Sequence, residues 1–418
     1  MRKLIIKGKR QLRGKISISG SKNATLPILA ASILSNKVIL KNIPLVKDIF
    51  TMAELLNFIG LKNKFFKKKN TLEITNNKKK INTLAPYKLV KTMRAGVLVL
   101  GPLLARYGKA KVSLPGGCAI GTRPVDLHLF ALKKLGAKIK IKNGYILAEA
   151  KNGLKGTTIR FPSVSVGATE NALLAAMIAE GKTVLKNCAV EPEVKDLISF
   201  LNKLGGKIKV SGRDVLIGES KINNNTINHK VIFDRIEAGT YMIASALIGK
   251  NLIINKINPK IIKSEIGILK KMGIAIETKK NSIKVSRNNN LKKINVFTKP
   301  FPGFPTDLQA QLMVLMTQAK GLSKISENIF ENRFMHVPEL RRMGAKINVT
   351  NKTAYIHGPT KLTGAEVMAT DLRASVSLVL AGLIADNRTI INRIYHLDRG
   401  YELLEKKLKR CNAQIKRI

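Results

Sequence analysis

Hydrophobic and polar positions alternate along the chain in a pattern that recurs about every 70 residues. Each copy begins with a polar segment, which leads into a stretch rich in small and apolar residues. Six such starts lie at residues 20–27, 94–97, 167–171, 237–240, 305–308 and 371–374. A helix that is apolar on nearly every side is a buried helix. The pattern therefore predicts six buried helices at equivalent places along the chain.

A short β-like segment, an amphipathic helix and a further strand follow each buried helix. The β-like segments lie at residues 38–40, 111–114, 183–185, 252–254, 323–325 and 389–391. The amphipathic helix is clearest at residues 194–204, where apolar side chains recur at helical spacing. Each copy of the pattern is thus expected to be an α-β-α-β unit.

Glycine marks the junction between most of the amphipathic helices and the next strand. It occurs at Gly136, Gly205, Gly273 and Gly344, and Asn412 takes the same place in the last copy. Both residue types tolerate a positive φ, which a helix C-terminus often requires. In residues 140–147 an Asn-Gly pair between two strand-like runs predicts a β-hairpin.

Six units that each leave one face apolar must pack together to bury it. We expect an α/β protein of two domains with three units each, at residues 20–231 and 232–418. Residues 1–19 are expected to complete the second domain, because a sixfold closed arrangement needs the segment before the first unit to finish the last one.

The composition excludes several classes of protein. Of the 418 residues 45% are apolar, which is too many for a disordered chain. Apolar stretches such as residues 95–105 are shorter than the roughly 20 residues of a membrane span, and the N-terminus lacks the apolar region of a signal peptide. Three cysteines form no disulfide framework. We therefore expect a cytoplasmic protein.

The charge is strongly positive, with 75 Lys and Arg against 26 Asp and Glu and a net charge of +49. Such a chain attracts anions. Lys is abundant together with Asn and Ile, which AT-rich codons encode, so we interpret the excess as compositional drift with a preference for small anionic molecules. Aromatic residues are 5% of the chain and Trp is absent, so no specific nucleic-acid partner is expected.

No metal and no cofactor are expected. The five histidines show no metal-ligand spacing. The chain contains neither a G-x-G-x-x-G motif nor a Walker loop, so neither a dinucleotide nor P-loop nucleotide hydrolysis is predicted.

Candidate binding residues gather at the starts of the predicted buried helices. They are Lys22 with Asn23, Arg94, Ser165 to Gly167, Asp307 and Arg373. Helix N-termini present unpaired N–H groups that suit phosphates and carboxylates. If these ends face one cleft, its ligand carries several negative charges. The structural alternative is that Ser165, Asp307 and Asp371 are helix caps, with Lys22 and Arg94 as solvated surface charges.

A glycine-rich insertion at residues 114–128 reads LPGGCAIGTRPVDLH. Its glycines interrupt a pattern that other copies continue, which predicts a mobile lid carrying Cys118 and Arg123. A thiol of ordinary pKa is mostly protonated at neutral pH, so Cys118 could act as an acid or as a nucleophile. The alternative is a small buried hydrophobic residue, as we expect for Cys188 and Cys411.

Taken together, these segments resemble the UDP-N-acetylglucosamine enolpyruvyl transferases over nearly the whole chain. The motifs occur in the family's order: GSKNA at 20–24, the loop at 114–128, SVGAT at 165–169, PTDLQAQ at 305–311, FENRFMH at 330–336, ATDLRA at 369–374 and DRG at 398–400. The loop with Cys118 is the most specific of them. The wider superfamily, which includes the shikimate-pathway enolpyruvyl transferase, lacks this loop but shares the two-domain inside-out α/β barrel of six repeated units that the resemblance implies.

The resemblance also implies a reaction. Phosphoenolpyruvate donates its enolpyruvyl group to the 3′-hydroxyl of UDP-N-acetylglucosamine by addition and elimination, and phosphate leaves. This is the first committed step toward peptidoglycan precursors. In this family Cys118 would protonate the enolpyruvyl methylene and Asp307 would take the sugar hydroxyl proton.

The family's substrate contacts carry over to matching positions. The resemblance assigns the phosphate of phosphoenolpyruvate to Lys22, Arg123 and Arg399, and its carboxylate to Arg333 and Arg373. Contacts with the UDP-sugar would come from Asn23, Arg94, Arg123, Pro124, Val125, Asp126, Leu127, Ser163, Val164, Ser165, Val166, Gly167 and Ile329. Ser163 departs from the pattern, because several relatives carry Lys there, and this puts the affinity for the UDP-sugar in question.

Three other hypotheses stay open at this point. The acceptor could be a shikimate phosphate, although the Cys118 loop speaks against it. The chain could be a non-catalytic paralogue that binds UDP-sugars or regulates the pathway, and a second enolpyruvyl-transferase copy would look the same. It could also be a protein that binds anions or nucleic acid through its charge. The oligomeric state is open as well.

Overall fold

The structure is a computed structural model that describes residues 2–76, 81–116 and 125–418. Contacts group the described residues into two compact units. The first unit comprises residues 20–116 and 125–232, and the second comprises residues 2–19 and 233–418. Within the described ranges, no helix has both the length and the apolar character needed to cross a membrane.

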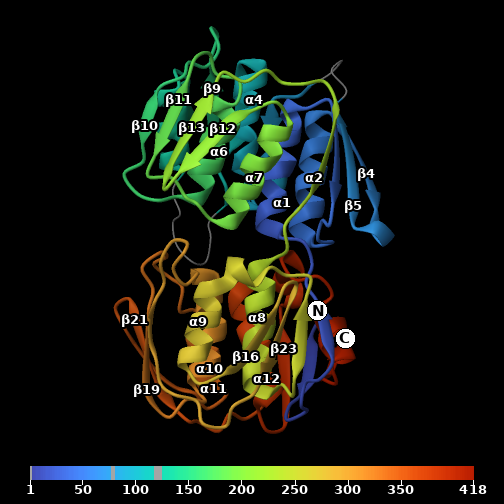
Figure 1. The fold of residues 1–418 in the computed structure, drawn as a ribbon, viewed down its shortest axis with the longest axis vertical. Coiled ribbons are helices and arrows are strands. Elements are labelled where there is room, and N and C mark those ends of the chain that lie inside the picture. Colours follow the sequence, from blue (N-terminus) through green and yellow to red (C-terminus); the bar gives the residue numbers. More distant parts are fainter. Residues whose placement is uncertain (1, 77–80, 117–124) are drawn as a thin grey trace. The chain divides into compact units, whose positions relative to one another are not determined.

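The described residues of the first unit form three largely buried helices, each followed along the chain by an amphipathic helix. Figure 1 shows most of these helices. The buried helices are α1 (Lys22–Ala31), α4 (Leu100–Tyr107) and α6 (Val166–Ala176). The amphipathic helices are α2 (Lys47–Ile59), α5 (Asp126–Lys134) and α7 (Pro192–Lys203), and a short helix α3 (Tyr87–Val90) precedes α4.

The described strands of the first unit form three four-stranded sheets. In order across each sheet they are β14 (Thr226–Lys230), β3 (Lys37–Lys41), β5 (Thr71–Asn76) and β4 (Leu61–Phe66); β6 (Leu84–Ala85), β7 (Lys109–Ser113), β9 (Tyr145–Glu149) and β8 (Lys138–Lys142); and β10 (Thr158–Arg160), β11 (Thr183–Lys186), β13 (Asp214–Gly218) and β12 (Lys207–Ser211).

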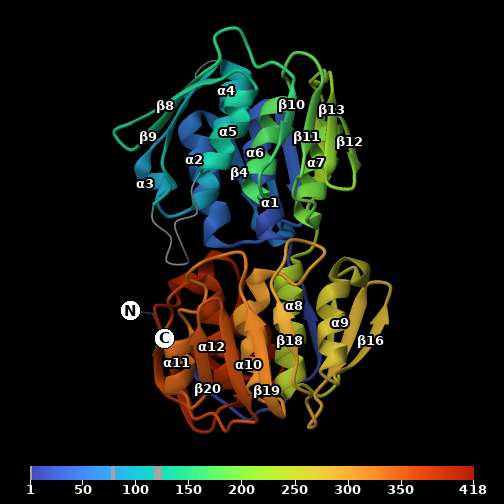
Figure 2. The ribbon, with the colours of Figure 1, turned by 90° about the vertical axis from the view of Figure 1, so that its left-hand side faces the viewer.

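The second unit repeats this arrangement (Figure 2). Its buried helices are α8 (Arg235–Ile248), α10 (Gln309–Met316) and α12 (Leu372–Ile384), and its outer helices are α9 (Lys263–Lys271), α11 (Val337–Arg342) and α13 (Leu404–Arg410). Its sheets, again in order and for the described residues, are β2 (Lys15–Ser17), β15 (Leu252–Asn255), β17 (Ser282–Ser286) and β16 (Ala275–Lys279); β18 (Asn295–Phe297), β19 (Gly321–Ser326), β21 (Thr353–Gly358) and β20 (Lys346–Thr350); and β22 (Glu366–Met368), β23 (Arg388–Asn392), β1 (Leu4–Lys7) and β24 (Gln414–Arg417).

One pairing rule holds across these sheets. A leading strand pairs in parallel with the strand that follows the buried helix, and an antiparallel pair completes the sheet. The N-terminal segment contributes one strand to each of two sheets of the second unit. Strand β1 pairs antiparallel with both β23 and β24, and β2 pairs in parallel with β15.

The cores of the two units lie around the buried helices. Every residue of α8 and of α10 is buried, and so are all but the first residue of α12. The predicted helical periodicity at residues 194–204 is confirmed by α7, which buries Val194, Leu197, Ile198 and Leu201. The α/β fold class with repeated units is thereby confirmed.

The predicted junctions are also found. Gly136, Gly205, Gly273, Gly344 and Asn412 all have a positive φ, between 77° and 107°. The Asn-Gly hairpin joins β8 and β9, with φ values of 51° at Asn143 and 73° at Gly144. Two predicted helix starts differ from α-helix: residues 94–99 and 306–308 are the 3-10 helices η3 (Arg94–Val99) and η5 (Thr306–Leu308), which precede α4 and α10.

Candidate active site

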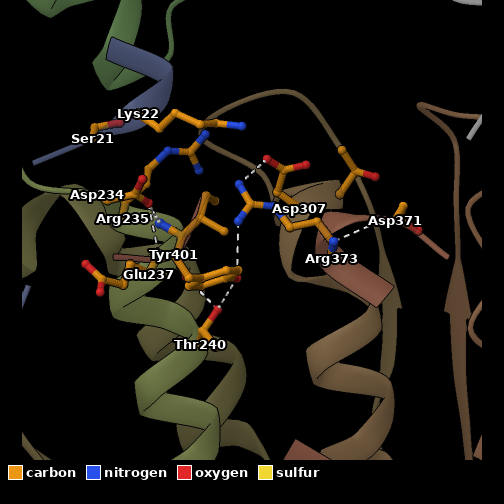
Figure 3. A network of polar contacts seen from close by, with 12 residues as sticks. Ser21, Lys22, Asp234, Arg235, Glu237, Thr240, Asp307, Asp371, Arg373 and Tyr401 are labelled. Atoms are coloured by element: carbon orange, nitrogen blue, oxygen red, sulfur yellow. Dashed lines mark hydrogen bonds and ion pairs between the residues drawn. The ribbon is translucent and has the colours of Figure 1, made fainter. Parts of the chain in front are cut away.

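In the second unit the carboxylate of Asp307 lies between two buried arginines, Arg333 and Arg373. Figure 3 shows its contact with Arg373. Arg333 Nη2 donates to Asp307 Oδ1 at 2.7 Å, and Arg373 Nη2 donates to Oδ2 at 2.9 Å. The arginine side chains are 4% and 6% exposed, while that of Asp307 is 27% exposed. Asp307 is therefore not the helix cap that the sequence allowed as an alternative, because η5 has no side-chain cap and the carboxylate is held by guanidinium groups.

Arg373 is fixed from a second side by Tyr401. Its Nη1 donates to the Tyr401 hydroxyl at 3.1 Å, and its Cζ lies 5.5 Å from the centre of the Tyr401 ring. Burial lowers the pKa of Arg373, but the charges of Asp307, Tyr401 and Asp234 and the hydrogen bond to Asp307 together outweigh this effect, so the net shift is upward. The guanidinium is thus a permanent cation that points one donor at Asp307 and another at Tyr401.

Each arginine is positioned by the local structure around it. Asp371 is the N-cap of α12, and its carboxylate accepts from Arg373 N at 2.7 Å and Ala374 N at 3.1 Å, which fixes the helix turn that carries Arg373. Arg333 Nη2 also donates to the Thr306 carbonyl at 3.4 Å. Within the described residues Arg333 Nε has no hydrogen-bond partner, so Arg333 keeps donor capacity beyond its contact with Asp307.

Glu327 organises the loops next to this ion-pair cluster. It is 1% exposed. Its Oε1 accepts from Ile329 N at 2.8 Å and from Thr298 Oγ1 at 2.9 Å, and its Oε2 accepts from Thr306 Oγ1 at 2.8 Å. One carboxylate thereby ties the segment of Ile329 to the turn that carries Asp307. Ile329 itself is exposed, at 36%.

Arg399 ends the 3-10 helix η6 (Ile394–Arg399) and is partly exposed. Burial lowers the pKa of His396, and the charge of Arg399 lowers it further. His336 is 1% exposed, and burial lowers its pKa to about 4. Both histidines are therefore neutral at pH 7, so the positive charge of this part of the unit comes from arginine.

In the first unit Lys22 begins α1 and is largely buried. Its Nζ lies 3.3 Å from Asp48 Oδ2, and the side chains are 11% and 6% exposed. Ser21 caps the helix, because its side chain accepts from Ala24 N at 3.2 Å. The interpretation of Lys22 as a solvated surface charge is thus wrong. Its neighbour Asn23 is the partly exposed residue of the same turn.

The start of α6 carries the predicted segment 163–167. Ser165 is the N-cap, as expected, and accepts from Ala168 N at 3.4 Å, while its carbonyl accepts from Thr169 N at 3.0 Å. Val166 and Gly167 are the first two residues of α6, so their N–H groups lie in the first turn ahead of the Ala168 and Thr169 N–H groups that bond to Ser165. Ser163 and Val166 are exposed, and Val164 is partly exposed. This helix end is therefore accessible and can present N–H groups to an anion.

A buried histidine supports the same helix end. His128 Nδ1 lies 3.1 Å from Asn171 Nδ2, and a Cβ on Gly167 would lie 3.0 Å from His128 Cε1. Burial lowers the pKa of His128 to about 3, and the charge of Arg94 contributes to this shift. Because Asn171 Nδ2 can only donate, Nδ1 is the acceptor and the neutral ring carries its proton on Nε2.

Other predicted residues fall close to these or outside the description. Val125 is buried just before α5, Asp126 begins that helix and is exposed, and Leu127 is partly exposed. Arg94 begins η3 and is partly exposed. Cys118, Arg123 and Pro124 lie outside the described residues. Cys188 and Cys411 are buried, as expected.

Several residues of these clusters were not predicted from the sequence. They are Asp48, His128, Asn171, Glu327 and Tyr401, together with Thr240 and Gln311, which lie 2.9 and 3.3 Å from the Tyr401 hydroxyl oxygen. His128 and Gln311 lie within motifs that carry the family resemblance, which was the available signal. Asn171 and Thr240 lie in two of the predicted helix starts, at residues 167–171 and 237–240. Asp48, Glu327 and Tyr401 are marked only by contacts between segments far apart in sequence. Within the described ranges, no three His, Cys, Asp or Glu side chains are grouped so that they could hold a metal ion.

Two solved structures share the fold over the full length of the chain: the enolpyruvyl transferase NikO from Streptomyces tendae, with a TM-score of 0.91, 24% identity and coverage of 98% of that chain, and EPSP synthase from Acinetobacter baumannii, with a TM-score of 0.76, 18% identity and coverage of 99%. The architecture is therefore that of the enolpyruvyl transferases.

Sequence comparison narrows the class. The family model described as EPSP synthase (3-phosphoshikimate 1-carboxyvinyltransferase) matches residues 6–408. Proteins called UDP-N-acetylglucosamine 1-carboxyvinyltransferase from Pelagibacter ubique and Rickettsia akari are 59% and 52% identical to this chain, over 100% of both chains in each case. The chain belongs to the EPSP synthase family and, within it, to the group of the UDP-N-acetylglucosamine 1-carboxyvinyltransferases.

Proposed function

We propose that the protein transfers the enolpyruvyl group of phosphoenolpyruvate to the 3′-hydroxyl of UDP-N-acetylglucosamine, with release of phosphate. It would thereby make the first committed precursor of peptidoglycan in the cytoplasm. Full-length identity of 59% and 52% to relatives of that name supports this substrate pair. The structural observation that supports it best is the carboxylate of Asp307 held by Arg333 and Arg373.

Arg333 and Arg373 bind the carboxylate of phosphoenolpyruvate in this proposal. A guanidinium presents five N–H donors in a planar fork, which suits bidentate contact with a carboxylate. Each arginine contacts Asp307 through Nη2, which leaves further N–H donors of the guanidinium groups for the ligand. Both cations are buried, which strengthens their interaction with an anion.

Asp307 takes the proton of the sugar hydroxyl during addition. The two arginines hold its carboxylate in the anionic form that accepts a proton, and its partial exposure leaves it reachable by a substrate. When the carboxylate of phosphoenolpyruvate shares the same guanidinium groups, the arginines neutralise less of the charge of Asp307. Binding of one substrate therefore raises the basicity of the group that activates the other.

Lys22, Arg123 and Arg399 bind the phosphate group in this proposal. Cys118 gives a proton to the methylene carbon and can itself attach covalently to the enolpyruvyl group. General acid or base catalysis of this kind typically contributes a factor of about 10²–10⁴ in rate. Arg123 and Cys118 belong to the glycine-rich loop, and the role of that loop as a lid is a proposal from the sequence.

The UDP-sugar is bound by the segments 23, 94, 123–127, 163–167 and 329 in this proposal. The accessible N-terminus of α6 suits a diphosphate, because its first-turn amides and its helix dipole favour anions. The neutral ring of His128 packs against Gly167 and accepts a hydrogen bond from Asn171, and these contacts hold the first turns of α6 in place. Ser163 supplies no charge, so the helix end carries more of this binding. The two units are proposed to be the two functional domains.

Phosphate release tests the proposal. Purified protein is incubated with phosphoenolpyruvate and UDP-N-acetylglucosamine, with phosphoenolpyruvate and shikimate 3-phosphate, and with phosphoenolpyruvate alone. Release that requires the UDP-sugar is the expected result. Release with the shikimate acceptor would replace the acceptor in our proposal, and no release from folded protein would favour a non-catalytic copy.

A further inference from the structure

We propose that Tyr401 and Thr240 form a positioning pair, which fixes the guanidinium of Arg373 for the carboxylate of phosphoenolpyruvate. This inference rests on the proposed function of Arg373. Tyr401 is 3% exposed and Thr240 is completely buried. Neither residue is in a position to touch solvent, so both act on the substrate through Arg373.

The hydrogen-bond donors can be assigned along this chain of contacts (Figure 3). Thr240 Oγ1 lies 2.8 Å from the carbonyl oxygen of Ile236, which can only accept, so the Thr240 proton points there. Tyr401 Oη lies 2.9 Å from Thr240 Oγ1. Because the Thr240 proton is used, Tyr401 donates to Thr240.

The lone pairs of the Tyr401 oxygen are then left for donors. Arg373 Nη1 donates to this oxygen at 3.1 Å, and Gln311 Nε2 lies 3.3 Å from it. Gln311 Nε2 also donates to the backbone carbonyl of Asp307 at 2.9 Å. The pair thus connects α8, through Thr240, with the start of α12 and the turn that carries Asp307.

This geometry restricts the rotation of Arg373. Its Nη2 is held by Asp307 and its Nη1 by Tyr401, and the ring of Tyr401 lies beside the guanidinium. When the substrate carboxylate draws on Arg373, the contact with Asp307 weakens but the contact with Tyr401 remains. The Tyr401 hydroxyl therefore keeps the guanidinium plane in place while the ligand changes.

Tyr401→Phe tests the pair with little change in packing. A hydrogen bond to a charged group corresponds to about a tenfold or larger change in an equilibrium constant. We expect the KM for phosphoenolpyruvate to rise about tenfold or more, with kcat and the KM for UDP-N-acetylglucosamine changed less than about twofold, because the contact serves binding of one substrate only. Thr240→Val should act in the same direction.

Two variants provide controls. Thr240→Ser keeps the hydroxyl and should restore the wild-type KM, which a packing role of the Thr240 methyl group would not allow. Tyr241→Phe removes the hydroxyl of the next residue, which is fully buried and has no hydrogen-bond partner among the described residues. This matched variant should leave both KM values at the wild-type level.

Other outcomes would overturn the inference. These are a Tyr401→Phe variant with the wild-type KM for phosphoenolpyruvate, equal losses for both substrates, or Thr240→Ser as impaired as Thr240→Val. If the wild type shows no turnover, the proposed function fails, and calorimetric binding of phosphoenolpyruvate in the presence of the UDP-sugar decides the inference separately. An unchanged Kd in Tyr401→Phe would then contradict it, and a weakened Kd would support it.

Discussion

Replacing Asp307 by Asn tests whether its charge compensates the two buried arginines. Asn keeps the size of the side chain but removes the anion that Arg333 and Arg373 share at 2.7 and 2.9 Å. Breaking a buried ion pair by removing one partner costs about 3–5 kcal/mol. The carboxylate of Asp307 is 27% exposed, so solvent screens part of this interaction, and we expect about 2–3 kcal/mol. For a unit of roughly 200 residues this lowers Tm by roughly 4–12 °C.

The assay is thermal unfolding followed by calorimetry, with Asp386→Asn as the matched control. Asp386 also contacts two lysines, Lys9 at 3.2 Å and Lys361 at 3.3 Å, and its side chain is 31% exposed. These lysine side chains are 57% and 79% exposed, so the control should lower Tm far less. Added acetate should raise the Tm of Asp307→Asn more than that of the wild type, because it can bind the unpaired arginines. An Asp307→Asn variant that loses no more stability than Asp386→Asn would refute the reasoning.

Three further predictions concern helix caps, a buried histidine and the loop thiol. Asp371→Ala should lower the free energy of unfolding in urea by about 1–2 kcal/mol, and Ser165→Ala by about 0.5 kcal/mol. The reason is that the Asp371 side chain accepts two hydrogen bonds, of 2.7 and 3.1 Å, whereas the Ser165 side chain accepts one of 3.4 Å. A larger loss for Ser165→Ala than for Asp371→Ala would contradict this. The pKa of His128 is about 3 in the folded protein and about 6.5 when unfolded, so its contribution is complete above pH 6.5 and falls by up to about 1.4 kcal/mol per pH unit below it. His128→Asn should flatten the loss of stability between pH 6.5 and 5, and an unchanged slope would count against the assignment. Cys118→Ala should release no phosphate yet unfold at the wild-type temperature, whereas full activity would exclude Cys118 as the proton donor.

The repeated architecture could be predicted because each of its elements is indicated by a short stretch of the sequence. A buried helix needs apolar residues on all sides, as in α8 and α10, and an amphipathic helix needs them on one side, as in α7. The junctions need a positive φ, which restricts them to Gly and Asn. Each of these signals lies within a few residues of the element that it predicts.

The connections within the candidate site could not be predicted in the same way. Asp307 is 26 residues from Arg333 and 66 from Arg373, and Thr240 is 161 residues from Tyr401. A motif can mark such residues individually, but which donor meets which acceptor is decided by how the buried helices pack. The neutral state of His128 likewise follows from burial, which its sequence neighbours do not reveal.

The identity of the product tests the central claim most directly. The acceptor would be recovered after incubation with phosphoenolpyruvate and UDP-N-acetylglucosamine, and examined by mass spectrometry and NMR. The account predicts an enolpyruvyl ether at the 3′-oxygen of the sugar, formed by the wild type and not by Asp307→Ala. An unmodified UDP-sugar after phosphate release, or an enolpyruvyl group at another oxygen, would contradict it.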